Sequence, residues 1–196
     1  MNSELEKIDN YIKGLGFKKM SFSELSKPGK GVPLVADENT AYCFDKISDG
    51  CYEASLFSAD ALLIKPRRLY LIEFKHVKPM IGDEKEREIL RLKLFLKMAE
   101  SFHTLQNHLF INCDADSSRF EKHFILVTEH FEEPLATTFA ACDRLSRNPA
   151  APAGDVYKDS FGKYRQQYKN SKKKVYYDSV DIWADFVFPD KVAKLK

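Results

Sequence analysis

Two short apolar segments follow each other closely in the chain, and charged residues mark their ends. Residues 60–64 are apolar after a leading aspartate, and residues 69–77 are rich in leucine, aromatic and β-branched side chains, which is typical of buried strands. Residues 65–68 contain a proline, whose fixed φ suits the second position of a turn. The pattern therefore predicts a β-hairpin. Because side chains alternate between the two faces of a strand, Glu73 and Lys75 are expected on the same face.

The loop sets the register of this hairpin. If residues 65–68 form the connection, Ile64 faces Leu69, and counting back along both strands places Asp60 opposite Glu73. Opposed residues of an antiparallel pair have Cβ atoms about 4.5–5.5 Å apart. Two carboxylates at that separation repel each other, so one is expected to be protonated unless a cation lies between them. Mg²⁺ accepts carboxylate ligands and keeps several waters, so it is the simplest such cation.

Lys75 is expected to point into the same site, where its charge can hold a phosphate or lower the pKa of an attacking water. The alternative is that Glu73 and Lys75 form an exposed pair on an edge strand and that Asp60 is only a polar strand start. Two features disfavour this alternative. The same strand face is apolar at Leu69 and Leu71, and the residue opposite Glu73 is another carboxylate.

An aspartate that begins one hairpin strand, followed by Glu-x-Lys on the next, resembles the PD-(D/E)xK phosphodiesterase superfamily of restriction-endonuclease-like proteins. Asp60, Glu73 and Lys75 match its motif one for one, although Ala59 stands where the family's name has proline. The resemblance covers about residues 51–128. It implies an α/β fold with an αβββαβ core and a central mixed four-stranded sheet. It also implies hydrolysis of nucleic-acid phosphodiester bonds with Mg²⁺ or Mn²⁺.

The resemblance also implies the metal ligands. Asp60 and Glu73 would bind the ion, with the Phe74 carbonyl as a further ligand, and many of these enzymes add a glutamate from the first helix. Four glutamates are open for that role, and Glu38 is preferred because it precedes Asp60 closely in the sequence. The four are Glu4, Glu6, Glu38 and Glu53.

The remaining pattern predicts one domain over residues 1–196, with a core of about residues 36–130 and a C-terminal elaboration over 131–196. Strand, helix and strand in succession from residue 69 to residue 128 predict a crossover that makes the last strand parallel to the Glu73 strand. The expected helices cover residues 3–13, 83–108 and 135–147, with a further helix after residue 156. The expected strands lie within residues 42–57 and at 122–129, 175–180 and 182–188.

Two groups of basic residues are candidates for contacts with a nucleic-acid backbone. Arg87 and Arg91 are four residues apart in the first turns of the long helix. Between residues 158 and 174 there are seven basic residues and one acid, interleaved with aromatics, a composition that can hold phosphates and stack bases. The alternative is an amphipathic helix whose aromatics face the core. The candidates in this segment are Lys163, Arg165, Lys169, Lys172, Lys173 and Lys174.

Composition adds limits rather than a function. The net charge of +2 allows no global argument for nucleic-acid binding, and four scattered cysteines predict neither a disulfide framework nor a zinc site. The first residues lack a signal-peptide pattern, and no Gly-rich phosphate loop occurs. We therefore expect a cytoplasmic protein without a membrane span. The long helix is apolar on two sides, which is compatible with a homodimer. The substrate stays open between DNA and RNA, with DNA preferred, and the alternative function is a catalytically silent nuclease-fold protein that binds nucleic acid or a protein partner.

Overall fold

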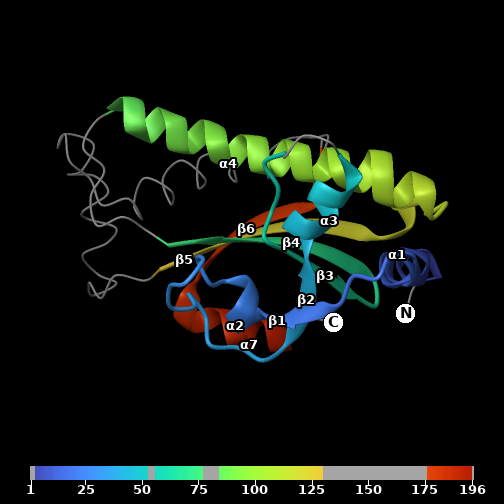
Figure 1. Ribbon diagram of the computed structural model, residues 1–196, viewed down its shortest axis with the longest axis horizontal. Helices are drawn as coiled ribbons and strands as arrows, with labels where there is room; N and C mark the ends of the chain where they lie inside the picture. Colours follow the sequence, from blue (N-terminus) through green and yellow to red (C-terminus); the bar gives the residue numbers. More distant parts are fainter. Residues whose placement is uncertain (1–2, 53–55, 77–83, 130–175, 196) are drawn as a thin grey trace.

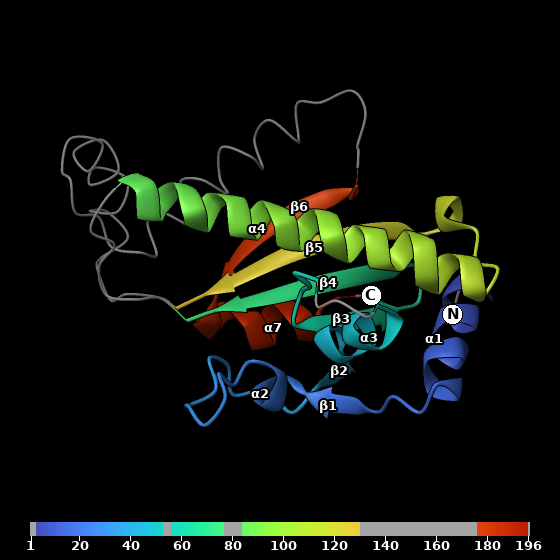
Figure 2. The same cartoon turned by 45° about the horizontal axis from the view of Figure 1, so that its top comes forward.

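The computed structural model describes residues 3–52, 56–76, 84–129 and 176–195. It is an α/β structure with one open, mixed, six-stranded sheet, in which the strands lie in the order of the sequence (Figure 2). Neighbouring strands from β1 to β4 are antiparallel, whereas β5 runs parallel to β4 and β6 runs parallel to β5. The strands are β1 (Lys19–Ser21), β2 (Thr40–Cys43), β3 (Ala61–Lys65), β4 (Arg68–Lys75), β5 (Glu121–Thr128) and β6 (Ser179–Ala184).

Helices cover both faces of this sheet (Figure 1). The long helix α4 lies along one face, and the short helices α2 and α7 lie on the other. A π-helical turn, Leu105–Phe110, continues α4 after its last residue. The α-helices of the described residues are α1 (Ser3–Gly14), α2 (Phe22–Leu25), α3 (Phe44–Cys51), α4 (Glu84–Thr104) and α7 (Phe188–Ala193).

The hairpin of β3 and β4 has the predicted register. Ile64 pairs with Leu69 and Ala61 with Ile72, so Asp60 is in line with Glu73. Lys65 also pairs with Arg68, which makes the connection a tight turn at Pro66 and Arg67. The parallel pairing of β4 and β5 through the α4 crossover was also predicted correctly.

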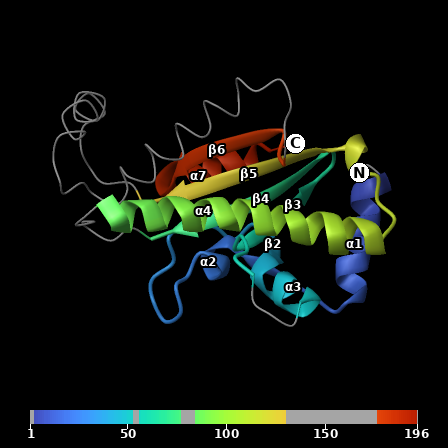
Figure 3. The same ribbon diagram turned by 90° about the horizontal axis from the view of Figure 1, so that it is seen from above.

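Alternation along β4 divides the interior into two cores. Leu69 and Leu71 pack in the core beneath α1, α3 and α4, and Tyr70, Ile72 and Phe74 pack in the core above α2 and α7. Seen from above, α4 crosses the strands with α1 and α3 on the same side of the sheet (Figure 3). Odd positions of β4 therefore point toward α4, and this is the face that carries Glu73.

Three predictions of local structure need correction. The sheet has six strands, because the three-residue β1, too short to give a pattern, extends one side of the expected four-stranded core and β6, from the expected C-terminal elaboration, extends the other. Residues 44–51 form helix α3 instead of continuing as strand, with Phe44 and Ile47 buried on one helical face. The two strand-like segments predicted over 175–188 are a single strand, β6, followed by a 3-10 helix, Asp185–Val187, and by α7, which begins at Phe188 with Pro189 in its first turn.

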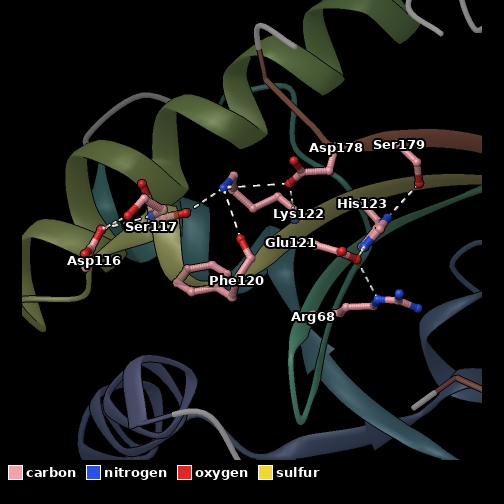
Figure 4. Close-up of polar contacts among 10 residues, drawn as sticks. Arg68, Asp116, Ser117, Phe120, Glu121, Lys122, His123, Asp178 and Ser179 are labelled. Atoms are coloured by element: carbon pink, nitrogen blue, oxygen red, sulfur yellow. Dashed lines mark hydrogen bonds and ion pairs between the residues drawn. The ribbon is translucent and has the colours of Figure 1, made fainter. Parts of the chain in front are cut away.

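A polar cluster connects the beginnings of β4, β5 and β6 (Figure 4). The Lys122 ammonium donates to the Ser117 carbonyl at 2.7 Å and lies 3.9 Å from the Asp178 carboxylate. His123 lies 2.6 Å from Ser179 Oγ, and burial lowers the pKa of His123. These contacts lie at the opposite end of β4 from Glu73. They therefore connect the beginnings of the strands and are not part of the predicted site.

Some predictions fall outside the described residues. The helices expected over 135–147 and after residue 156 lie there, as does the basic segment over 158–174. Within the described ranges, no helix combines the length and the apolar character that crossing a membrane requires.

Candidate active site

The three residues of the predicted motif meet at the end of β4. Asp60 directly precedes β3, and its carbonyl accepts a hydrogen bond from Phe44 N at 3.0 Å. Its carboxylate reaches across the hairpin, where Oδ2 accepts from Phe74 N at 2.5 Å. Glu73 and Lys75 follow on the same face of β4, and Lys75 Nζ lies 2.5 Å from Glu73 Oε1. The alternative of an exposed Glu-x-Lys pair is wrong for Glu73, whose side chain is 0% exposed.

A second lysine, which sequence reasoning missed, lies between the two acids. Lys97 Nζ of α4 is 2.8 Å from Glu73 Oε2 and 3.6 Å from Asp60 Oδ1. Burial lowers the pKa of Lys97, but the attraction of Glu73 and Asp60 outweighs burial and raises it above its usual value. The opposed carboxylates were expected to need a cation between them, and the Lys97 ammonium supplies that positive charge. The one available signal was that Lys97 stands next to Met98 and three residues after Leu94, both of which belong to the buried stripe of the helix.

Hydrogen bonds hold α4 against the segment that leads into Asp60. Ser101 Oγ, one helical turn after Lys97, accepts from Ala59 N at 2.8 Å. Glu100 accepts from Phe57 N at 2.6 Å. Ala59 and Ser101 are both buried, so the hydrogen bond between them is protected from water, whereas the bond between Glu100 and Phe57 is exposed. Lys97 thus reaches Asp60 from a helix that is fixed to the adjacent backbone.

A third acid, Asp45, approaches the site from the first turn of α3. Its carboxylate accepts a hydrogen bond from Ser58 Oγ. Burial raises the pKa of Asp45, with the nearby charge of Lys97 opposing this effect and that of Glu73 adding to it. Sequence reasoning missed Asp45 because one or two strands were expected within residues 42–57, where the structure has helix α3. Three carboxylates here face the ammonium groups of Lys75 and Lys97, which leaves one negative charge in excess.

Burial and this excess of negative charge both act on the Asp60 carboxyl. Burial and the neighbouring charge of Glu73 raise the pKa of Asp60 well above its usual range, against the lowering effects of Lys97 and the hydrogen bond from Phe74 N. The folded protein therefore holds a proton on Asp60 more tightly than the unfolded chain does. The stabilising contribution of Asp60 is complete below its ordinary pKa and is lost as the pH rises through its folded value.

We expect Asp60→Asn to raise the free energy of unfolding at neutral pH by about 1–2 kcal/mol in metal-free buffer, since it removes a destabilising buried charge. The asparagine oxygen can still accept from Phe74 N. The gain should shrink as the pH falls toward about 4, below which wild-type Asp60 is protonated in both states. Urea unfolding between pH 4 and pH 8 measures it. The exposed Asp49→Asn is the matched control, and a gain independent of pH would contradict the assignment.

The structure does not bring Glu38 to the other acids. Glu38 is exposed, accepts a hydrogen bond from Ser23 Oγ at 3.2 Å, and lies beside β1 and α2. Glu4 accepts from Asp116 N at 2.8 Å and pairs with Lys7, so it is engaged elsewhere. Glu6 is exposed on α1, and Glu53 lies outside the described residues.

The other predicted contacts are only partly described. The Phe74 ring packs in the core above α7, while its amide faces Asp60. Arg87 and Arg91 belong to α4, but their side chains lie outside the described part of the structure. The tail residues Lys163, Arg165, Lys169, Lys172, Lys173 and Lys174 also lie outside it.

The donor set suits a hard divalent cation. The carboxylate oxygens of Asp60 and Glu73 converge on the Lys97 ammonium. Mg²⁺ is often held by one or two carboxylates together with water and substrate phosphates. Glu73 Oε1 is buried and pairs with Lys75 without hydrogen-bond geometry, so it keeps an acceptor position. Among the described residues, no group of three His, Cys, Asp or Glu side chains is already arranged to hold a metal. The residues therefore fit a two-carboxylate site.

The chain matches no protein-family model, no curated protein and no solved structure.

Proposed function

We propose that this chain is a metal-dependent nuclease that hydrolyses nucleic-acid phosphodiester bonds, with DNA as the preferred substrate. The observation that carries the proposal is that the Asp60 and Glu73 carboxylates converge on one positive charge, the Lys97 ammonium. Lys75 lies two residues after Glu73 on the same strand face. The hairpin followed by the α4 crossover and a parallel strand is compatible with a restriction-endonuclease-like core. That fold assignment is part of the proposal.

Each residue has a distinct role in this proposal. Asp60 and Glu73 would hold Mg²⁺ or Mn²⁺, with the Phe74 carbonyl as a further ligand, and Asp45 would add negative charge nearby. The bound ion would supply Lewis acidity and lower the pKa of a water molecule. Phe74 N orients the Asp60 carboxylate. Lys75 is 26% exposed, more than Lys97 at 17%, so its ammonium is the better placed to contact a phosphate oxygen and stabilise the charge that develops there.

The test is cleavage of labelled single- and double-stranded DNA and RNA with Mg²⁺ or Mn²⁺, against EDTA. Lys75→Ala should lower the cleavage rate at least about 10²-fold, the usual loss when a charge-stabilising donor is removed. Lys65→Ala is the matched control, because Lys65 belongs to the same hairpin at its turn end. Products formed equally by the Lys75 variant, or in EDTA, would refute the proposed mechanism.

One observation favours a second candidate function. Lys97 already neutralises Glu73 and approaches Asp60, so the acids have a counter-ion without any metal. A catalytically silent nuclease-fold protein would need no more than this, and would bind nucleic acid or a protein partner. Nucleic-acid binding that survives both EDTA and Lys75→Ala, with no cleavage of any substrate, would support this alternative over the nuclease.

A further inference from the structure

The Lys97 ammonium contacts both carboxylates of the proposed metal site. The ammonium is 2.8 Å from Glu73 Oε2 and 3.6 Å from Asp60 Oδ1, and the Lys97 side chain is only 17% exposed. These are the same two carboxylates that would hold the ion. The hydrogen bonds of Ser101 and Glu100 to the backbone before Asp60 fix the helix that carries Lys97.

An ammonium and a divalent cation cannot occupy this space together. Mg²⁺ needs carboxylate oxygens at about 2.0–2.1 Å, and at such distances from Glu73 and Asp60 it would repel a charge that already contacts both. A lysine side chain has a flexible four-carbon stem, so the ammonium can leave while the α4 backbone stays in place. Glu73 lacks this freedom because its side chain is fully buried in the sheet face.

We propose that Lys97 is the built-in counter-ion of the metal-free site, and that a divalent cation binds by displacing its ammonium. The inference rests on the proposed metal site and deepens it by naming the internal competitor of the metal. The ammonium stabilises the buried Glu73 before the ion arrives. It also weakens metal binding, because its contacts must break first. The displaced ammonium would be free to contact a substrate phosphate.

Calorimetric titration with Mn²⁺ tests this competition. Lys97→Met keeps the length of the side chain and removes its charge, so it should lower the dissociation constant for Mn²⁺ at least about tenfold, equivalent to ~1.4 kcal/mol. Lys93→Met is the matched control, because Lys93 lies one turn earlier on α4 and is exposed. Equal affinities in the two variants, or weaker binding by Lys97→Met, would overturn the inference.

A measurement on the unaltered chain covers the case in which Lys97→Met does not fold. Lysine acylation followed by mass spectrometry of the peptides reports the accessibility of each ammonium. Saturating Mg²⁺ should raise the acylation rate of Lys97 several-fold and leave that of Lys93 unchanged. If Lys97 stays equally protected at Mg²⁺ concentrations that calorimetry shows to be saturating, or if the wild-type chain binds no divalent cation, the inference fails.

These readouts do not depend on turnover, so they separate the inference from the proposed nuclease activity. Metal binding that displaces Lys97 in a protein that cleaves no substrate would retain the inference and refute the nuclease. Metal-dependent cleavage without any change at Lys97 would retain the nuclease and refute the inference.

Discussion

Glu73→Gln is expected to lower the free energy of unfolding by about 3–5 kcal/mol, the usual cost of breaking a buried ion pair by removing one partner. The glutamate side chain is 0% exposed and contacts Lys75 and Lys97. Removal of its charge leaves the Lys97 ammonium with the more distant Asp60 oxygen at 3.6 Å. Under the proposed function, the same variant also loses metal-dependent cleavage. Equilibrium unfolding in urea measures the stability loss.

Glu121→Gln is the matched control for this prediction. Glu121 is also a glutamate in an ion pair, with Arg68 at 2.7 Å, but both side chains are about half exposed, at 51% and 43%. Exposed pairs of this kind contribute about 0–1 kcal/mol. Glu73→Gln is expected to destabilise the fold, whereas Asp60→Asn is expected to stabilise it. The difference arises because the Glu73 carboxylate has two close ammonium partners, Lys75 and Lys97, while Asp60 has only the longer contact with Lys97. Equal losses for Glu73→Gln and Glu121→Gln would show that the inner pair is as well solvated as the surface pair.

Phe188→Ala is expected to cost about 3–5 kcal/mol through the cavity it leaves in the core above α7. Phe188 is fully buried, and its ring centroid lies 5.0 Å from Phe22 and 5.5 Å from Phe74. It therefore links α7 and α2 to the strand that carries Glu73. Thermal or urea unfolding of the variant measures the loss.

Phe186→Ala controls for the deletion of a phenyl ring from the same segment. Phe186 is 62% exposed and precedes α7, so its removal should change the free energy of unfolding by less than about 1 kcal/mol. If Phe188→Ala were no more harmful than Phe186→Ala, α7 would not be an integral part of this fold.

The hairpin was predictable because its determinants are local. Two short apolar runs joined by a turn that contains proline specify which residues pair, and the pairing of Ile64 with Leu69 confirms the register. The register in turn specified that Asp60 lies across from Glu73 and that both face the same core as Leu71. Side chains alternate between the two faces of a strand, so counting from a short turn specifies both the partner and the face of each residue.

The contents of the site beyond the hairpin were not predictable in this way. Asp45 comes from a segment whose apolar residues suit a strand as well as a helix, and only burial of Phe44 and Ile47 on one helical face distinguishes the two. Lys97 lies 24 residues after Glu73, and its approach depends on the rotation of α4 about its axis. That rotation is set by the packing of Leu94 and Met98 and by the Ser101 hydrogen bond.

By itself, the sequence determined the β3–β4 hairpin, the parallel strand after α4, and the placement of Asp60 across the hairpin from Glu73 with Lys75 on the same face of β4. Short-range periodicity and turn chemistry suffice for these features, because they involve residues close together in the chain. Only the tertiary structure decided which charge neutralises the carboxylates and which third acid lies beside them. The energy of a buried charge depends on every group packed around it, and α3 and α4 bring those groups from distant parts of the chain.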